Sequence, residues 1–234
     1  MKLLENKSVV VVAGILIILG IAVLACGPQT APAPAAPQAA IQRQPTAFSP
    51  IVIDKQAGEI RIAARVNGKA FTDPTWHGVV YEKGKNAGVA VFQSYVSPNL
   101  VHDSLKFSGG EPGNNMPAKD YSAMYVKGSD IDVSVTWEGA PKTYSLIEVL
   151  KDPDGQSGKG IQTKFGGNYE RIDTAGTGCE TCFYSCPVGI TSNSAYNGDD
   201  FARQKSAGQA GFLGNKDVLP PAGTDVVIIY RVKS

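Results

Sequence analysis

Residues 131–138 read IDVSVTWE and form the clearest strand pattern in the chain. Apolar side chains occupy every second position and polar ones lie between them, as in a β-strand with one buried and one exposed face. The preceding triplet, Gly128-Ser129-Asp130, has a counterpart in Gly223-Thr224-Asp225, which precedes the apolar run 226–230. Both triplets have the composition of a turn that leads into a strand. The two segments therefore predict strands of an antiparallel sheet.

Two further pairs of strands are predicted nearer the amino end. Residues 51–54 and 59–66 have β-like patterns, and the turn composition of the residues between them predicts a hairpin. Residues 77–81 and 88–92 form the second predicted pair. The 26 glycines and 15 prolines also favour a chain with many turns. We therefore expect a mainly β fold, β-sandwich-like and antiparallel, with one or two short helices.

The best helix candidate begins at Ser97-Pro98. Ser97 is a suitable N-cap, Pro98 suits the first helical position, and Gly109-Gly110 would end the helix. Apolar residues at helical spacing predict that this helix packs across a sheet. His102 falls on the same helix, and we expect it at the surface.

The amino end carries the pattern of an export signal. The first seven residues carry Lys2 and Lys7, and residues 8–25, which follow them, are uncharged and almost wholly apolar. This run ends in Val23-Leu24-Ala25-Cys26, which resembles the lipobox of bacterial lipoproteins, where the signal peptide is removed before the Cys and its sulfur receives a diacylglycerol. The alternative is an uncleaved transmembrane anchor, since the run barely reaches the length of a membrane span. Both interpretations place the rest of the chain outside the cytoplasm and at a membrane.

Three parts follow from this organisation. Residues 1–26 are the predicted lipoprotein signal peptide with its lipobox Cys, and residues 27–49 are a Pro/Ala-rich linker with too few large apolar side chains to fold. Residues 50–234 are predicted to form one β-rich domain with a Cys-rich loop toward its C-terminal end.

The charge of the chain is balanced, with 22 Lys+Arg against 21 Asp+Glu. Such a surface offers no general attraction for nucleic acid, so we expect no nucleic-acid partner.

Three of the four cysteines lie within residues 176–189, which read GTGCETCFYSCPVG. The spacing C-x2-C-x3-C-P matches the end of the bacterial ferredoxin run, whose first Cys is replaced here by Gly176. The glycines and Pro187 favour a tight loop in which several sulfurs turn toward one point. Because Cys26 belongs to the predicted anchor, this chain alone supplies three cysteines to such a site.

Three interpretations of these thiols stay open. The first is an iron–sulfur cluster on Cys179, Cys182 and Cys186, although the signal lacks a twin arginine and so predicts export of an unfolded chain, which would lose a cluster made before export. The second is a zinc site in which His77, or less favourably Asp173, is the fourth ligand. The third is a disulfide with one thiol left over, which is common in exported proteins, or thiol redox chemistry of the C-x-x-C pair.

Several segments of the chain are distinctive when taken together. They are Asp54-Lys55, EIRIAARVN at 59–67, PTWH at 74–77, GNNM at 113–116, VSVTWEG at 133–139, GKGIQTKFGGN at 158–168, GTGCETCFYSCPVGITSN at 176–193 and GNKDVLPPAGTDV at 214–226. With these segments the chain resembles the YdjY-domain family of ferredoxin-like lipoproteins over most of residues 51–232. The resemblance implies that His77 and the three cysteines are family features. Our first hypothesis is therefore a membrane-anchored domain with a three-cysteine redox or metal site, used in electron or thiol transfer, with a redox protein as partner.

An alternative from another class is a non-enzymatic binding or structural domain whose cysteines form a disulfide or a zinc site. The sequence shows no Gly-rich phosphate loop, no Ser/His/Asp arrangement and no G-x-S-x-G motif. We therefore lean toward a protein that is not an enzyme.

Overall fold

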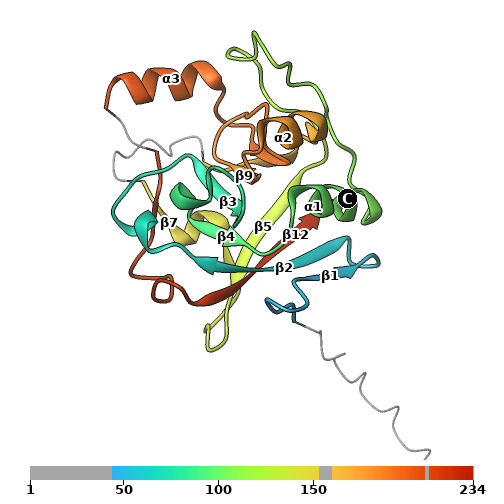
Figure 1. Ribbon diagram of the computed structural model, residues 1–234, viewed down its shortest axis with the longest axis vertical. Helices are drawn as coiled ribbons and strands as arrows, with labels where there is room; N and C mark the ends of the chain where they lie inside the picture. Colours follow the sequence, from blue (N-terminus) through green and yellow to red (C-terminus); the bar gives the residue numbers. More distant parts are fainter. Residues whose placement is uncertain (1–43, 153–159, 209–210, 234) are drawn as a thin grey trace, which may run out of the picture. The chain divides into compact units, whose positions relative to one another are not determined.

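The computed structural model describes residues 44–152, 160–208 and 211–233 (Figure 1). The predicted signal peptide, Cys26 and most of the predicted linker lie outside these residues, so their assignments stay predictions. Within the described ranges, no helix combines the length and the apolar character that crossing a membrane requires.

Strands dominate the described domain. They are β1 (Ile51–Asp54), β2 (Glu59–Val66), β3 (His77–Tyr81), β4 (Phe92–Ser94), β5 (Ile131–Thr136), β6 (Tyr144–Ser145), β7 (Leu150–Lys151), β8 (Thr163–Phe165), β9 (Cys179–Cys182), β10 (Thr191–Asn193), β11 (Leu213–Gly214) and β12 (Asp225–Val232). The α-helices of the described residues are α1 (Pro98–Phe107), α2 (Tyr169–Ala175) and α3 (Gly198–Ser206). The prediction of a mainly β fold with short helices is confirmed.

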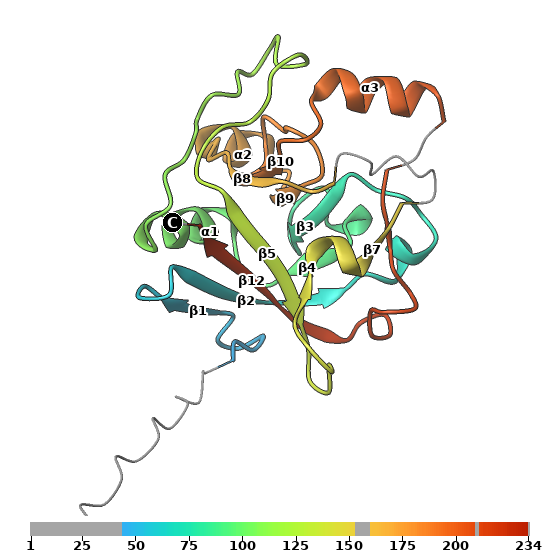
Figure 2. The same ribbon diagram turned by 180° about the vertical axis from the view of Figure 1, so that it is seen from behind.

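Most strands belong to one curled sheet with the order β6-β5-β12-β2-β4-β3-β9-β10-β8, seen from two sides in Figure 1 and Figure 2. β1 also pairs with β2, and β7 and β11 form a separate pair. The two ends of the sheet approach each other, since Asp130 bridges Lys164 and the Phe165 N–H donates to the Ser129 carbonyl over 2.8 Å. Because the sheet curls, strands of the same sheet face one another across the hydrophobic core.

β2, β5 and β12 form the regular antiparallel half of this sheet. β12 pairs in continuous register with β2 on one side and β5 on the other. β5 buries Ile131, Val133 and Val135 and turns Asp132 to solvent, as its alternation predicts. The predicted hairpin of β1 and β2 is also present.

This regular half buries one carboxylate, which is paired with a mostly buried arginine, Arg61, and an exposed one, Arg231. Glu59 is 2% exposed. Its Oε1 accepts a hydrogen bond from Arg61 Nε over 2.6 Å, and its Oε2 accepts one from Arg231 Nη2 over 2.5 Å. A buried charge is tolerated when it is paired and hydrogen-bonded in this way.

The second predicted strand pair is partly wrong. β3 lies where expected, but its partner β4 starts only at Phe92, runs parallel to β3, and follows a 3-10 turn at Ala87–Val89. The physical reason is Asn67, which donates its side-chain amide to the Ala90 carbonyl over 2.7 Å and its backbone N–H to the Val91 carbonyl over 2.9 Å. These contacts hold residues 88–91 in a bend instead of a strand.

α1 forms as predicted, with Ser97 as its N-cap accepting from the Leu100 N–H over 3.4 Å. The expectation that His102 lies at the surface is wrong, because its exposed fraction is only 8%. Phe165 of β8 and Tyr169 of α2 cover it, with ring centroids 5.3 and 5.0 Å from that of the imidazole. Those contacts come from residues more than 60 positions away, so helical periodicity could not show them.

Candidate metal centre

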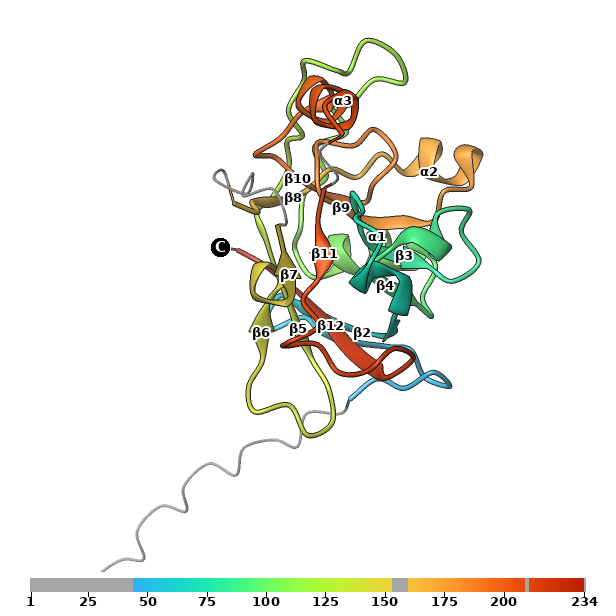
Figure 3. The ribbon, with the colours of Figure 1, turned by 90° about the vertical axis from the view of Figure 1, so that its left-hand side faces the viewer.

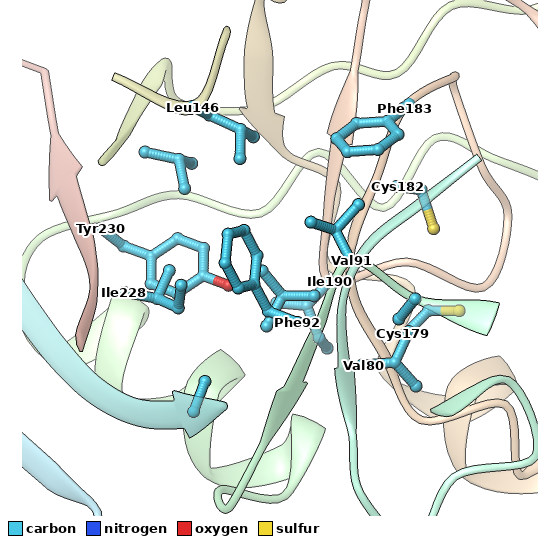
Figure 4. Packing of buried hydrophobic residues seen from close by; sticks show 14 of the residues in the cluster. Val80, Val91, Phe92, Leu146, Cys179, Cys182, Phe183, Ile190, Ile228 and Tyr230 are labelled. Atoms are coloured by element: carbon cyan, nitrogen blue, oxygen red, sulfur yellow. The ribbon is translucent and has the colours of Figure 1, made fainter. Parts of the chain in front are cut away.

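The site is built on the antiparallel strands β3 and β9, where His77 lies directly opposite Cys182. Cys179 and Cys182 are three positions apart and would face opposite sides of a regular strand. The register shifts between them, so that Glu180 is an extra residue in β9, a β-bulge. The bulge brings both sulfurs to the same side of the strand, away from Tyr230 in the core (Figure 4).

Two glycines allow close packing around these sulfurs. A Cβ on Gly78 would lie 2.9 Å from the ring of Phe183, and a Cβ on Gly189 would lie 2.9 Å from Cys182 Sγ. Gly78 is also the extra residue on β3 that restores the register after the bulge on β9. Side chains at these two positions would push apart the segments that carry the ligand candidates.

The turn that follows β3 packs against the residues that precede β9. A Cβ on Gly84 would lie 2.6 Å from the Cα of Gly178, and the Asn86 N–H donates to the Thr177 carbonyl over 3.2 Å. This close contact places the Asn86 side chain beside the first thiol. Its Nδ2 donates to the sulfur of Cys179 over 3.5 Å.

The donor atoms of His77, Cys179 and Cys182 all lie within 4.8 Å of one another. His77 Nδ1 lies 3.5 Å from Cys179 Sγ. In the part of the chain that the structure describes, this is the one cluster of three or more His, Cys, Asp or Glu side chains close enough to hold a metal ion.

The three thiols are free and buried, with exposed fractions of 0–1%. The pKa of Cys179 lies well below its usual range because the Cys182 thiol donates to its sulfur, with further hydrogen bonds from His77 and Asn86. The pKa of Cys182 lies well above its usual range because of its hydrogen bonds with Cys179 and Cys186 and because it is buried. Cys179 is therefore predisposed to be a thiolate, the form of Cys that binds metals.

Cys186 lies beside this group. It forms a hydrogen bond with the Cys182 thiol, but its sulfur is not one of the donor atoms that lie within 4.8 Å of one another. Its backbone is held from the far side by Asn168, whose Nδ2 donates to the carbonyls of Cys186 over 3.1 Å and Gly189 over 3.3 Å. Asn168 is 3% exposed, so one buried amide fixes both ends of the loop that carries the third thiol.

The GNNM segment, residues 113–116, helps to hold Asn168 in place and so supports the loop that carries Cys186. Asn114 Oδ1 accepts the backbone N–H of Asn168 over 3.2 Å. Both residues have left-handed backbone angles, with φ of 46° for Asn114 and 49° for Asn168, a conformation that Asn tolerates better than most residues. Gly167 fits between them, because a Cβ there would lie 2.4 Å from Asn114 Oδ1.

A group of packed aromatic side chains adjoins the Cys segment. Phe183 and Tyr184 follow the second thiol and are buried, as is Trp76 before β3. Tyr184 stacks on Phe201 of α3 with ring centroids 4.6 Å apart. Figure 3 shows α3 over the end of the domain that carries β9 and β10. The buried rings and α3 therefore form an apolar cover at this end of the domain.

His77 is the ligand candidate that reaches the surface. It is half-buried, and it lines a groove of about 390 Å³ together with Trp76, Tyr184, Phe201 and Lys205. The imidazole therefore lies between the buried sulfurs and solvent.

The other predicted site residues fall elsewhere. Asp173, the weaker zinc-ligand candidate, is exposed on α2 and is not part of the cluster. Cys26 lies outside the described residues. The tight loop predicted for the Cys segment begins only after Cys182, because Cys179–Cys182 is strand β9. The β-bulge in this strand places the sulfurs of Cys179 and Cys182 on one side, and a loop is not needed for this.

Glu180 is a polar residue of the site that sequence reasoning missed. It is fully buried, and neither carboxyl oxygen makes a hydrogen bond of good geometry to a residue that the structure describes. Burial raises its pKa well above the usual range; the nearby Ser94 hydroxyl opposes this shift and the negative charge of Cys179 adds to it. The neutral acid is therefore favoured, and no pattern in the sequence marks it.

Comparison with known proteins identifies the family of the chain. A family model described as the YdjY domain matches residues 51–231. The chain is also similar to a protein from Escherichia coli (strain K12) described as "Uncharacterized protein YdjY", with 36% identity over 183 residues that cover 78% of this chain and 79% of that protein. No solved structure matches the chain.

Proposed function

The chain belongs to the YdjY domain family, and from that premise we propose that its domain binds a single thiophilic metal ion between His77, Cys179 and Cys182. The observation that carries this proposal is the clustering of the three donor atoms within 4.8 Å. A tetrahedral ion such as zinc, with metal–sulfur bonds of about 2.3 Å, holds its ligand atoms roughly 4 Å apart. The side chains therefore need only small movements to surround one ion.

The donor set selects the class of ion. Thiolate and imidazole ligands suit zinc and other thiophilic ions, whereas calcium and magnesium require oxygen ligands. Cys186, which hydrogen-bonds with Cys182, is the residue that we expect to supply the fourth donor. A Cys₃His set of this kind is a known zinc-binding combination.

An iron–sulfur cluster with a role in electron transfer is the second candidate. The observation in its favour is the apolar cover of Phe183, Tyr184 and Trp76, because shielding from solvent is one way in which proteins tune redox centres. A cluster is larger than one ion and would require the three donor atoms to spread. A disulfide between Cys179 and Cys182 is the remaining alternative, and it would leave the domain as a metal-free binding or structural module.

We also propose that the protein acts at a membrane, on its extracytoplasmic face. The apolar run before Cys26 and the lipobox-like VLAC sequence support a lipid anchor on that residue. The partners in this proposal are the membrane and, if the centre carries electrons, a redox protein. The proposed activity is metal binding or electron transfer, and it assigns no catalytic residue.

Native mass spectrometry of protein purified without oxygen from its own membranes tests these proposals. We expect a mass increase equal to one metal ion. Iron together with sulfide would favour the cluster, and a mass two protons below that of the reduced metal-free chain would establish a disulfide and overturn the metal proposal.

Two matched Cys→Ser variants serve as reciprocal controls. Cys182→Ser should lose the metal and keep the mass of the lipid, whereas Cys26→Ser should lose the lipid and keep the metal. Loss of metal in both variants would mean that the ion does not depend specifically on the β9 thiols.

A further inference from the structure

A groove of about 390 Å³ opens beside His77. Its size lies within the range of small-molecule sites, about 300–1,000 Å³. One wall is α3, which contributes Phe201 and Lys205, and the other includes Val89, which is 53% exposed. The groove is distinct from the thiol cluster and touches it only through the imidazole.

The floor of the groove is held in place from two sides. Thr75 exchanges two backbone hydrogen bonds with Phe212, of 2.8 and 2.9 Å, and the Trp76 carbonyl accepts the Phe183 N–H over 2.9 Å. The Thr75 hydroxyl also accepts the N–H of His77 over 3.0 Å. The segment that presents the imidazole is therefore rigid before any ligand arrives.

The groove carries one charged side chain. Among the described residues that line it, Lys205 is the one Lys or Arg, and there is no carboxylate. Three aromatic side chains, Trp76, Tyr184 and Phe201, also line it, and they pack on one another so that only part of each ring faces the groove. Shape and charge together suit a small ligand with a flat apolar body and one negative charge.

We propose that this groove binds a small, flat organic anion, such as an aromatic carboxylate, with its charged end at Lys205 and its body beside His77. The inference rests on the proposed function, because it places the ligand next to a metal-binding imidazole. The proposed function is metal binding. This inference adds the recognition of an organic molecule beside His77, the ligand candidate that reaches the surface.

Trp76 provides the measurement. It and Trp137 are the two tryptophans of the chain, and Trp137 is stacked on Tyr144 in the β5–β6 region. In a Trp137→Phe background of the full chain in detergent, emission reports Trp76 alone. We expect 4-nitrobenzoate to quench this emission saturably and to bind about fivefold more tightly than the neutral isostere 4-nitrobenzamide, the ratio that one partly exposed ion pair supplies.

A pair of charge variants sharpens the test. Lys205→Gln should abolish the preference for the anion, so that the two probes bind within about twofold of each other. Lys106→Gln removes the same charge from α1, outside the groove, and should leave the preference intact. Because all measurements use the same detergent, partitioning of the probes into micelles cancels between variants.

The proposal is overturned if quenching does not saturate, if the two probes bind equally to the parent, or if Lys106→Gln has the same effect as Lys205→Gln. Metal content is measured on each sample. Anion-selective binding to a metal-free protein would support the groove and contradict the metal proposal, whereas a loaded metal site without selective binding would contradict the groove alone.

Discussion

The two halves of the curled sheet bury a carboxylate in opposite ways. In the regular half, Glu59 pairs with Arg61 of its own strand β2 and with Arg231, which lies directly opposite on β12 in continuous register. In the half formed by β3, β9 and β10, Glu180 is buried at a bulge without a counter-ion among the described residues. The first arrangement stabilises the fold. The second costs free energy and is tolerated because the same bulge turns two thiols toward one imidazole.

The largest expected effect separates stability from metal binding. Glu59→Ala removes the carboxylate on which Arg61 and Arg231 converge, and we expect the free energy of unfolding to fall by about 3 kcal/mol, as when one partner of a buried ion pair is lost. Metal affinity at 25 °C should change by less than about twofold while the protein stays folded, because the pair lies outside the site. Urea unfolding and metal titration measure the two quantities. A parallel loss of affinity would show that the halves are not independent.

A pair of glycine variants compares local packing in the irregular half. Gly78→Ala places a Cβ 2.9 Å from the ring of Phe183, and we expect it to cost about 2 kcal/mol of stability through overpacking. It should also weaken metal binding, because Gly78 follows His77. Gly88→Ala is the matched control, since a Cβ there meets nothing within 4 Å. Equal urea midpoints for the two variants would contradict the close packing assigned to Gly78.

The regular half is the part that sequence patterns predict well. The alternation of IDVSVTWE specifies which face of β5 is buried, and the hairpin of β1 and β2 follows from local turn composition. The parallel pairing of β3 with β4 could not be predicted in the same way. It depends on Asn67, whose contacts with residues more than 20 positions away bend the chain at 88–91.

The site was predictable in its residues but not in its geometry. The spacing of the cysteines and the PTWH segment pointed to Cys179, Cys182, Cys186 and His77. The structure clusters the donor atoms of His77, Cys179 and Cys182 and leaves Cys186 beside that cluster. No pattern in the sequence of residues 179–182 predicts the β-bulge that brings these side chains together. Asn86 and Asn168 were missed because Asn in a Gly-rich segment has the same appearance whether it forms a turn or donates to a buried site.

Asn168 allows a finer test of how the third thiol is held. Asn168→Gly keeps the left-handed backbone accessible but removes the amide that binds the Cys186 and Gly189 carbonyls. We expect metal affinity to fall about tenfold, as for the loss of a residue that supports a ligand. Cys186 should also react faster with a thiol reagent in the metal-free protein. Asn114→Gly shares the left-handed backbone but makes no recorded contact with Cys186, so its effect should stay below about threefold. Equal effects would assign the role to the whole segment instead of to the amide.

An effect that is smallest near pH 4 and grows with pH concerns the buried carboxyl of Glu180. Its pKa is raised in the folded state by burial above an ordinary value of 4.5. Above about pH 4.5 the unfolded chain therefore releases this proton while the folded protein retains it, so stability declines with rising pH by up to about 1.4 kcal/mol per pH unit until the folded carboxyl ionises. Glu180→Gln lacks this decline. In the presence of a chelator, we expect the variant and the parent to differ little at pH 4 and the variant to be more stable by about 1 kcal/mol or more at pH 8. Glu138→Gln, at an exposed position, corrects for the general loss of one negative charge. Stability curves of parent and Glu180→Gln that stay parallel from pH 4 to pH 8 would mean that Glu180 finds a charge partner in the folded protein, and the contrast with Glu59 would then disappear.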